Sequence, residues 1–386
     1  MKVLMINSVC GIGSTGRICT DLANELTKKG HDVKIAYGRE QASNKFSDYA
    51  VKIGGRFSVK LNALKARLFD NEGFNAKRAT KKFLKWAEEF NPDVLHLHNL
   101  HGYYLNVELL FKWIKSRPNM KVLWTLHDCW AFTGHCSYFD YANCDKWQIE
   151  CCNCPQKRKY PKSIFKSNAK NNFIKKKMAF CGIENLQIIT PSKWLKGLVK
   201  NSFLKEYEVK VVYNGIDVNV FKPTISEFKK VNNLEHKKII LGVANVWEER
   251  KGFSEFIELS KLIDGDTRIV LVGVSDKQLN VLPNNVLGIK RTNSVDELVE
   301  IYSASDVLFN PTYEDNYPTV NLEAQACGTP VITYKTGGSV ESVPNENVIE
   351  KGNYKEVLEK LNKKLKIKES DFSKNSMIEG YLKLIN

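Results

Sequence analysis

The chain has 386 residues, of which 43% are hydrophobic and 26% are charged. These values are ordinary for globular proteins and exclude a disordered, collagen-like or disulfide-scaffold chain, and the length predicts two domains, or three. No apolar run approaches the ~20 residues of a membrane-spanning helix and no secretory signal is evident, so we expect a cytoplasmic protein. The ten cysteines are then expected to be thiols or metal ligands rather than disulfides.

The excess positive charge is confined to the N-terminal half. The net charge is +15 for the chain, +18 for residues 1–200 and −3 for the rest, and residues 151–200 alone contribute +11. A one-sided field of this kind attracts an anionic partner, such as nucleic acid, acidic lipid or a phosphorylated substrate. A generally Lys-rich composition would instead spread Lys along the whole chain.

Short β-rich runs alternate with amphipathic stretches in chain order. In the first half we expect strands at 3–6, 33–37, 51–53, 94–98, 122–126, 186–190 and 209–213. Helices are expected between several of them, at 18–28, 76–90 and 107–116. The second half repeats the alternation, with strands at 238–243, 268–272, 286–289, 306–310 and 331–334 and helices at 253–262, 294–302 and 319–327.

Strands that alternate with helices predict βαβ units and parallel sheets buried on both faces. Two such series predict an α/β protein with two doubly wound, Rossmann-like domains. We place the first domain at 1–205, with a cysteine-rich insert at 129–156 and a basic segment at 157–177. The second domain is placed at 206–370, and a C-terminal helix at 371–386 is expected to pack back on the first. Ligands of such sheets bind beyond the carboxyl ends of the strands, so the loops that follow strands hold the candidate site residues.

A glycine-rich loop joins the first strand to the first helix. Its candidate contacts are Gly13, Thr15, Gly16 and Arg17. Glycines there let backbone N–H groups approach an anion at the positive end of a helix. We favour a phosphate-contacting loop over a purely structural turn, and over a dinucleotide site that would rest on Glu40 as the acidic partner.

Two histidines share one face of the strand at 94–98, because side chains alternate along a strand. His98 is predicted at its exposed end, where it can donate a hydrogen bond or shuttle a proton. His96 is expected to be a packed core residue. His127 follows the next strand and joins the candidates of the phosphate loop.

The strongest motif spans residues 311–331, where a strand ends, an acidic loop follows and a helix begins. Pro318 suits the first turn of that helix. The free N–H groups of Thr319 and Val320 can cradle a phosphate. Glu323 lies about one turn inside the helix, where its carboxylate can accept hydrogen bonds from two ribose hydroxyls.

A basic pair follows the first strand of the second half. Arg250 and Lys251 supply the charges that a diphosphate leaving group needs. Such a pair on a loop is usually solvated surface, but its place at a strand end makes the functional interpretation equally tenable.

Together these motifs resemble the retaining family 4 glycosyltransferases of the GT-B fold, in which two Rossmann-like domains face a central cleft. The stretch 125–136 resembles bacterial enzymes that build exopolysaccharide or O-antigen repeat units. The matching motifs run in chain order: Gly13–Arg17, Asp93–His98, Thr125–Asp128, Thr190–Ser192, Asn214–Asp217, Lys251-Gly252, Pro311–Val331 and Thr336–Gly338.

The resemblance implies three catalytic residues. Asp315 contacts the donor sugar, where the family usually has Glu and where Glu314 is the alternative. Lys251 binds the diphosphate and His98 the transferred sugar, while Glu323 binds the donor ribose. The other donor-binding candidates are Asn245, which replaces a family Arg, Arg250 as its substitute, Arg291, Thr292, Asn316, Tyr317, Thr319 and Val320.

The resemblance also implies the reaction. A sugar would pass from a UDP- or GDP-sugar to a hydroxyl of a lipid-linked glycan with retained configuration, by front-face substitution and with no cofactor required for catalysis. The alternatives are a sugar-nucleotide epimerase, a dinucleotide oxidoreductase, or a non-enzymatic zinc-containing protein that binds nucleic acid.

The insert and the basic segment suggest two further features. Four cysteines, Cys136, Cys144, Cys151 and Cys154, have the number and spacing of a structural zinc site, with reduced thiols or a redox pair as alternatives. The segment 157–177 interleaves basic and large apolar residues. We interpret it as a peripheral binding site for an anionic membrane, here the inner membrane face, in preference to an ordinary solvated basic helix. We expect no nucleic acid partner.

Overall fold

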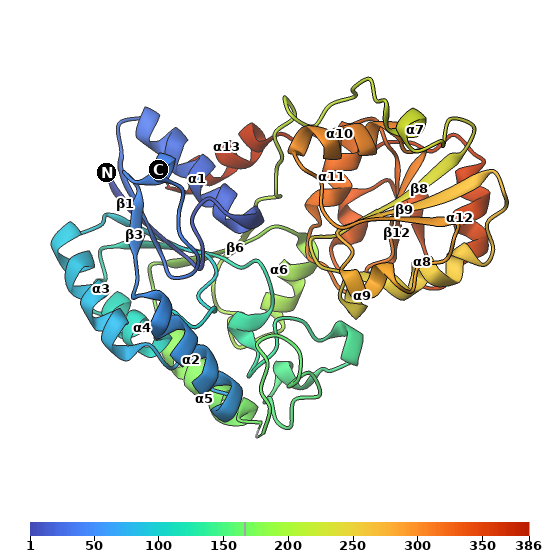
Figure 1. Cartoon of the computed structure of the whole chain (residues 1–386). Coiled ribbons are helices and arrows are strands. Elements are labelled where there is room, and N and C mark those ends of the chain that lie inside the picture. The colour runs from blue at the N-terminus through green and yellow to red at the C-terminus, as the bar shows by residue number, and fades with distance from the viewer. Residues whose placement is uncertain (166, 386) are drawn as a thin grey trace. The chain divides into compact units, whose positions relative to one another are not determined.

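The computed structural model describes residues 1–165 and 167–385, and it divides into two compact units. Unit 1 comprises Met1–Val212 together with the chain from Ile378 onward, and unit 2 comprises Tyr213–Met377. Each unit is built on one parallel sheet flanked by helices (Figure 1). The predicted α/β class with two doubly wound domains is therefore confirmed.

Within the described residues, the sheet of unit 1 has seven strands in the order β3-β2-β1-β4-β5-β6-β7. The strands are β1 (Lys2–Asn7), β2 (Asp32–Tyr37), β3 (Ala50–Lys52), β4 (Val94–Leu97), β5 (Lys121–Thr125), β6 (Leu186–Thr190) and β7 (Val209–Val211). The helices are α1 (Gly13–Lys28), α2 (Arg56–Phe69), α3 (Lys77–Phe90), α4 (Val107–Lys115), α5 (Ala169–Phe180), α6 (Lys193–Lys200) and the last part of α13 (Lys374–Ile385).

Every residue of unit 2 is described, and its sheet has six strands in the order β10-β9-β8-β11-β12-β13. The strands are β8 (Lys238–Val243), β9 (Thr267–Val272), β10 (Val286–Ile289), β11 (Val307–Asn310), β12 (Val331–Tyr334) and β13 (Val348–Ile349). The helices are α7 (Phe228–Val231), α8 (Phe253–Ser260), α9 (Asp276–Leu279), α10 (Val295–Ala304), α11 (Thr319–Ala326) and α12 (Tyr354–Leu361).

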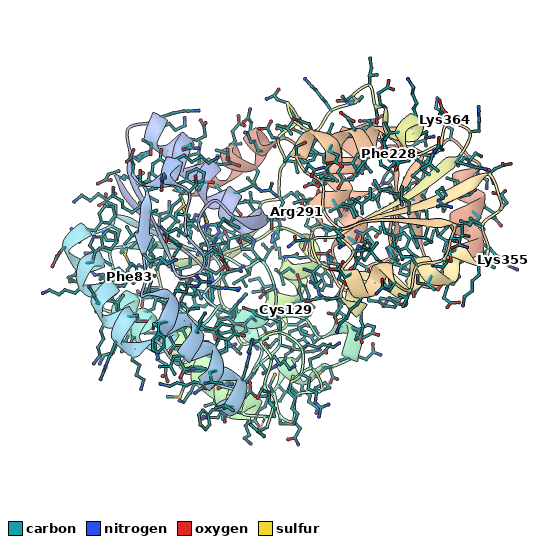
Figure 2. All side chains as sticks on the ribbon, in the orientation of Figure 1. Phe83, Cys129, Phe228, Arg291, Lys355 and Lys364 are labelled. Carbon is teal, nitrogen blue, oxygen red and sulfur yellow. The ribbon has the colours of Figure 1, made fainter. Side chains whose placement is uncertain are left out.

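The core of unit 1 explains why its strands are continuous apolar runs. Val3–Ile6 on the central strand β1 are fully buried, since helices cover both faces of a parallel sheet. Phe83 on α3 and Cys129 after β5 lie in the same core (Figure 2). At its C-terminal end the chain returns to this unit, where the ring of Tyr381 on α13 lies 5.3 Å from that of His96.

Three aromatic rings anchor α5 to this core. The ring of Phe180 lies 4.4 Å from that of Phe111 on α4 and 5.0 Å from that of Trp124 on β5. Phe173, about two turns earlier on the same side of α5, is also buried. The helix that carries much of the basic segment is thus fastened to the sheet through its apolar side.

We predict that Phe180→Ala lowers the free energy of unfolding of unit 1 by about 3–5 kcal/mol, because it removes a fully buried ring from a close-packed cluster. Urea unfolding followed by tryptophan fluorescence measures the change. Met178→Ala, two residues away and 73% exposed, is the matched control. A loss no larger than that of the control would contradict the packing role of Phe180.

Candidate functional site

Each sheet has one point at which its strand order reverses. In unit 1 it lies between β1 and β4, and in unit 2 between β8 and β11. Neighbouring loops leave the sheet in opposite directions there, which opens a crevice at the carboxyl ends of the strands. The glycine loop and His98 follow the two strands of the first reversal, while Lys251 and residues 311–318 follow those of the second. The strongest sequence motifs therefore sit where doubly wound sheets bind ligands.

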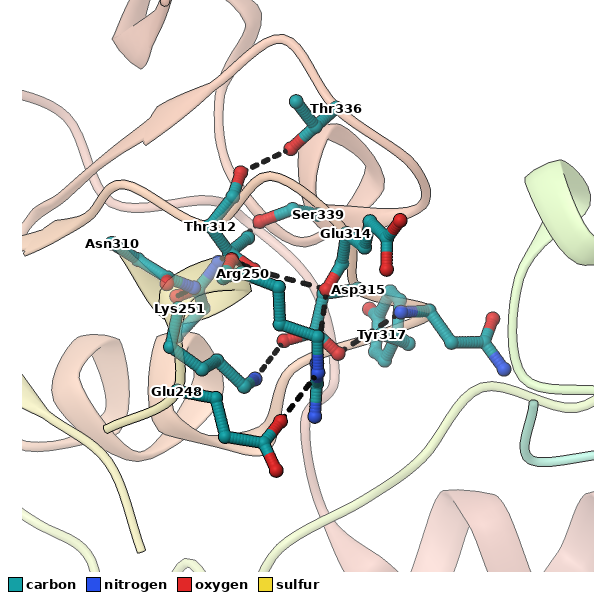
Figure 3. Close-up of polar contacts among 12 residues, drawn as sticks. Glu248, Arg250, Lys251, Asn310, Thr312, Glu314, Asp315, Tyr317, Thr336 and Ser339 are labelled. Carbon is teal, nitrogen blue, oxygen red and sulfur yellow. Dashed lines mark hydrogen bonds and ion pairs between the residues drawn. The ribbon is translucent and has the colours of Figure 1, made fainter. Parts of the chain in front are cut away.

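An ion pair joins the two loops at the reversal of unit 2. Lys251 Nζ lies 2.5 Å from Asp315 Oδ2, and their side chains are 24% and 12% exposed. Arg250 donates from its guanidinium to the Glu314 carbonyl oxygen at 3.2 Å and also pairs with Glu248 (Figure 3). The sequence motifs at 245–252 and 311–331 thus form one site, in which Asp315 pairs with the lysine.

The backbone around this ion pair is held by two glycines. Gly252 has φ +76°, and a Cβ there would approach the Pro311 carbonyl oxygen to 2.3 Å. Gly337 has φ +50°, and its Cβ would lie 2.2 Å from the Asp315 carbonyl oxygen. Side chains are excluded at both positions by conformation and by space, so the loops can approach each other this closely only with glycine.

Glu323 lies on the buried side of α11. Its Oε2 accepts a hydrogen bond from the Tyr302 hydroxyl at 3.0 Å, and the residue is 7% exposed. Burial and the neighbouring carboxylate raise the pKa of Tyr302 well above its usual value, so this phenol stays a donor. Tyr302, on α10, was not among the residues predicted from the sequence, and it positions the Glu323 carboxylate.

Next to this carboxylate is the N-terminus of α11, which begins at Thr319, so Pro318 is the N-cap residue and not part of the first turn as predicted. Pro318 precedes α11 and makes no side-chain cap to the helix. Thr319 and Val320 supply the first N–H groups of that helix, which intrahelical hydrogen bonding leaves available. Of the loop residues before it, Asn316 and Tyr317 are both buried.

The other donor-binding candidates lie along the same edge of the sheet. Asn245 is exposed in the loop after β8. Arg291 and Thr292 follow β10, three strands from β11 and so about 14 Å away across the sheet. The structure brings Arg250, Lys251 and Asp315 together, and it leaves Arg291 and Thr292 in a separate loop.

The glycine loop of unit 1 forms a tight turn. The Gly11 N–H donates to the Gly16 carbonyl oxygen at 3.1 Å, and a Cβ on Gly11 would enter the ring of Phe46. Gly13 begins α1 with φ +64° and has open space around it. Asn7, at the end of β1, donates to Thr15 at 3.4 Å and accepts from the Asn99 N–H at 3.2 Å. It links the glycine loop to the loop after His98, and sequence reasoning missed it.

His98 is buried rather than at an exposed strand end, since it is only 2% exposed. Its Nδ1 lies 3.1 Å from His127 Nε2, and its ring lies 4.1 Å from that of His96. Burial and the neighbouring rings hold the pKa of His98 well below its usual value and that of His127 at about 4. His98 is therefore a neutral hydrogen-bonding group near pH 7. Among the described residues its buried Nε2 has no partner.

A second polar cluster in unit 1 was missed from the sequence. His101 bridges Asp128 Oδ2, 2.8 Å from its Nε2, and the Tyr160 hydroxyl, 2.9 Å from its Nδ1. Burial opposes ionisation of Asp128, but the charge and hydrogen bond of His101 lower its pKa overall. The carboxylate of Glu72 accepts from two backbone N–H groups nearby, and burial raises its pKa. The only sequence signal was the position of His101 and Asp128 just beyond strand ends.

The four cysteines predicted as zinc ligands lie in or against the core of unit 1. Cys136 donates a hydrogen bond to Cys154, which lowers the pKa of the Cys154 thiol to about 7. The Gly134 N–H donates to Cys151 Sγ at 3.2 Å. Across the ranges 1–165 and 167–385, no three or more His, Cys, Asp or Glu side chains are grouped as a metal ion requires.

Family comparisons match both units. Residues 15–220 match the model of Glycosyltransferase Family 4, and residues 224–378 match that of Glycosyl transferases group 1. The chain is 25% identical to the colanic acid biosynthesis glycosyl transferase WcaC of Escherichia coli K12, over 86% of this chain and 82% of that protein.

Two further proteins resemble parts or all of the chain. It is 28% identical, over 38% of its length and 42% of the other, to N,N'-diacetylbacillosaminyl-diphospho-undecaprenol alpha-1,3-N-acetylgalactosaminyltransferase of Campylobacter jejuni. The crystal structure of Anabaena HepE in complex with UDP superposes with a TM-score of 0.67 at 14% identity, covering 100% of this chain and 99% of that one. The fold is GT-B. In the part of the chain that is described, no helix has the length and apolarity to span a bilayer.

Zinc binding by the cysteine cluster stays a prediction, and it is tested by metal content. We expect protein purified without chelators to carry about one zinc per chain, because four cysteines at this spacing in the sequence can supply the closed ligand set of a structural zinc site. Mass spectrometry of the metal measures it. Cys154→Ser should release the metal, whereas Cys181→Ser, outside the insert, should not. A metal-free wild-type protein would contradict the prediction.

Proposed function

The chain belongs to the family 4 glycosyltransferases, and from that premise we propose that it transfers a sugar in polysaccharide biosynthesis. The sugar moves from a UDP- or GDP-sugar to a hydroxyl of a lipid-linked glycan, and its anomeric configuration is retained. The single observation that carries the donor half is the Lys251–Asp315 ion pair at the strand-order reversal of unit 2, with Glu323 on the helix that follows.

The ion pair provides both polarities that a sugar diphosphate presents. The ammonium of Lys251 attracts the diphosphate, and the carboxylate of Asp315 accepts hydrogen bonds from sugar hydroxyls. Arg250, held by the Glu314 carbonyl, adds positive charge beside Lys251. The two side chains are preorganised against each other at 2.5 Å, so little rearrangement of the loops is needed when the donor enters.

The Glu323 carboxylate is suited to the ribose. One oxygen is oriented by Tyr302, and the fixed carboxylate can accept from the two adjacent hydroxyls of a nucleoside. The N–H groups of Thr319 and Val320 lie about one turn earlier, at the positive end of α11, where a phosphate is stabilised. This spacing supports a nucleoside diphosphate at that end of the helix.

In the proposed reaction the bond between the anomeric carbon and the phosphate oxygen breaks as the bond to the acceptor oxygen forms on the same face. The acceptor proton passes to the departing phosphate oxygen, so atoms and charge balance. Lys251, Arg250 and the α11 N-terminus stabilise the negative charge that develops on the diphosphate. His98 contributes a neutral-ring hydrogen bond to a sugar hydroxyl, since its low pKa keeps it uncharged near pH 7.

The proposed acceptor is supported by the names of two relatives and by the positive charge of residues 1–200. The Campylobacter jejuni relative acts, by its name, on a diphospho-undecaprenol glycan, and WcaC is named for colanic acid biosynthesis. The positive charge of residues 1–200 favours an acceptor that carries diphosphate at an anionic membrane surface. The cluster of His101, Asp128, Tyr160 and Glu72 offers donors and acceptors for the hydroxyls of a glycan.

We predict that Glu323→Ala weakens nucleotide-sugar binding about 10-fold to 100-fold, because hydrogen bonds to a charged group are lost. A thermal-shift panel of UDP-, GDP- and ADP-sugars first identifies the donor, and calorimetry then measures its Kd. The control is Glu258→Ala, an exposed carboxylate on α8. Unchanged donor affinity in Glu323→Ala would mean that the donor site is elsewhere.

The stereochemical part is tested separately, by proton NMR of the glycoside formed from that donor. We expect the anomeric coupling of the product to match that of the donor. An inverted product would exclude front-face substitution. Conversion of the nucleotide-sugar to its epimer without any acceptor would show that the chain is an epimerase instead.

A further inference from the structure

Helix α2 exposes its large apolar residues to solvent, which is the reverse of the usual pattern for a helix on the surface of a globular unit. The side that faces unit 1 fully buries only Asn62 and Ala66, with Val59 partly buried against the core, and Asn62 donates to the Tyr103 carbonyl oxygen at 3.1 Å. The large apolar residues Phe57, Leu61 and Leu64 are 80%, 42% and 51% exposed. Surface helices ordinarily bury such residues against the core, so the packing of unit 1 leaves this side of α2 unexplained.

The exposed residues form one stripe. Phe57, Leu61 and Leu64 are spaced by four and three positions, so they lie above one another on the same side of the helix. At the C-terminal end of α2 a second segment with exposed apolar residues lies against the helix, because the Ile164 N–H donates to the Arg67 carbonyl oxygen at 2.8 Å. We call the combined surface the α2 face; its apolar residues are Phe57, Leu61, Leu64, Ile164 and Phe165, from 42% to 80% exposed.

Positive charge borders the stripe on both sides. Lys60 precedes Leu61 and Lys65 follows Leu64, which places the two ammonium groups on opposite flanks of the stripe, and Arg56 and Arg67 add to them. Helix α2 contains no acidic residue. In the described part of the chain, no ion pair involves any of these four cations. Their charge is therefore available to an external partner.

The basic helix α5 is less suited to that role than its sequence indicated. Lys176 is buried, and its ammonium donates to the carbonyl oxygens of Trp130 and Thr133 at 2.7 and 3.1 Å. Lys170 pairs with Glu150 and Lys175 with Glu108. Much of the charge of α5 is thus used within unit 1.

Phe173, an apolar residue of the basic segment 157–177, belongs to the core, as does Phe180 just beyond the segment. The expectation of a membrane-binding surface within 157–177 stays a prediction, but the buried Phe173 cannot take part in it. Ile164 and Phe165 are the residues of that segment that join the α2 face.

We propose that the α2 face docks on an anionic lipid bilayer, with its apolar stripe inserted at the headgroup level and its cations on lipid phosphates. An apolar stripe with cations on both flanks, on a helix with no acidic residue, is complementary to an anionic lipid surface. The proposal deepens the proposed function, since a lipid-linked acceptor is met at a membrane. It stands on the geometry of unit 1 and does not depend on the chemistry of unit 2.

The test is sedimentation of the full chain with vesicles. Wild-type protein is expected to bind phosphatidylcholine–phosphatidylglycerol vesicles and to bind pure phosphatidylcholine vesicles much less. Phe57→Ser, Leu61→Ser and Leu64→Ser combined are expected to lower the partition coefficient at least about tenfold. Lys60→Gln and Lys65→Gln are each expected to lower it about fivefold, and only with the anionic vesicles.

The matched control replaces equally exposed apolar residues of unit 2, by Ile225→Ser, Val231→Ser and Val281→Ser, which are 93%, 76% and 61% exposed. This variant should bind vesicles like the wild type. The α2 variant should keep its thermal midpoint and its response to nucleotide-sugars, because none of its residues is in the donor site.

Equal vesicle binding by the α2 variant and the wild type would overturn the proposal. So would absence of binding to anionic vesicles, or a wild-type dimer that the α2 substitutions dissociate, which would assign the face to a second copy of the chain. Failure of the donor panel with intact vesicle binding would contradict the proposed function alone.

Discussion

The parallel direction of every strand is the constraint on which the rest of the structure depends. Parallel strands need crossover helices, and those helices bury both faces of each sheet, so the strands are apolar throughout. All the carboxyl ends then meet at one edge, and the strand order reverses once in each sheet. Loops that are far apart in sequence, such as 245–252 and 311–318, are brought into contact there because β8 and β11 are neighbours.

Polar groups at these edges are held by partners of opposite or complementary character. Lys251 is paired with Asp315, Glu323 with Tyr302, and Asp128 with His101. His96 and His98 are neutral instead, because burial disfavours the charged form of each ring and lowers its pKa. Unit 2 therefore presents fixed charges suited to a diphosphate, and unit 1 presents neutral and hydrogen-bonding groups suited to sugar hydroxyls.

Some interactions could not be predicted from the sequence, because they join residues that are far apart along the chain. Tyr302 and His101 act through contacts with residues 21 and 27 positions away, and nothing local in their surroundings distinguishes them from ordinary helix or loop residues. In the sequence Lys176 is indistinguishable from the other cations of the basic segment. In the structure it is buried, and its ammonium group contacts the ring and the carbonyl oxygen of Trp130. The sequence analysis assigned no role to helix α2. Its apolar residues can be recognised as exposed only when the side of the helix that faces the unit is known.

The sequence by itself determined the alternation of strands and helices, the two doubly wound domains, the loops that carry Lys251 and Asp315 and the helix that carries Glu323. These features follow from local periodicity and from short motifs, which need no knowledge of distant contacts. Only the tertiary structure decided which charges are paired, that His98 is buried, and that the charge of α5 is largely used internally while that of α2 is free. Net charge and hydrophobicity are sums over residues, whereas burial and pairing depend on which elements the fold places side by side.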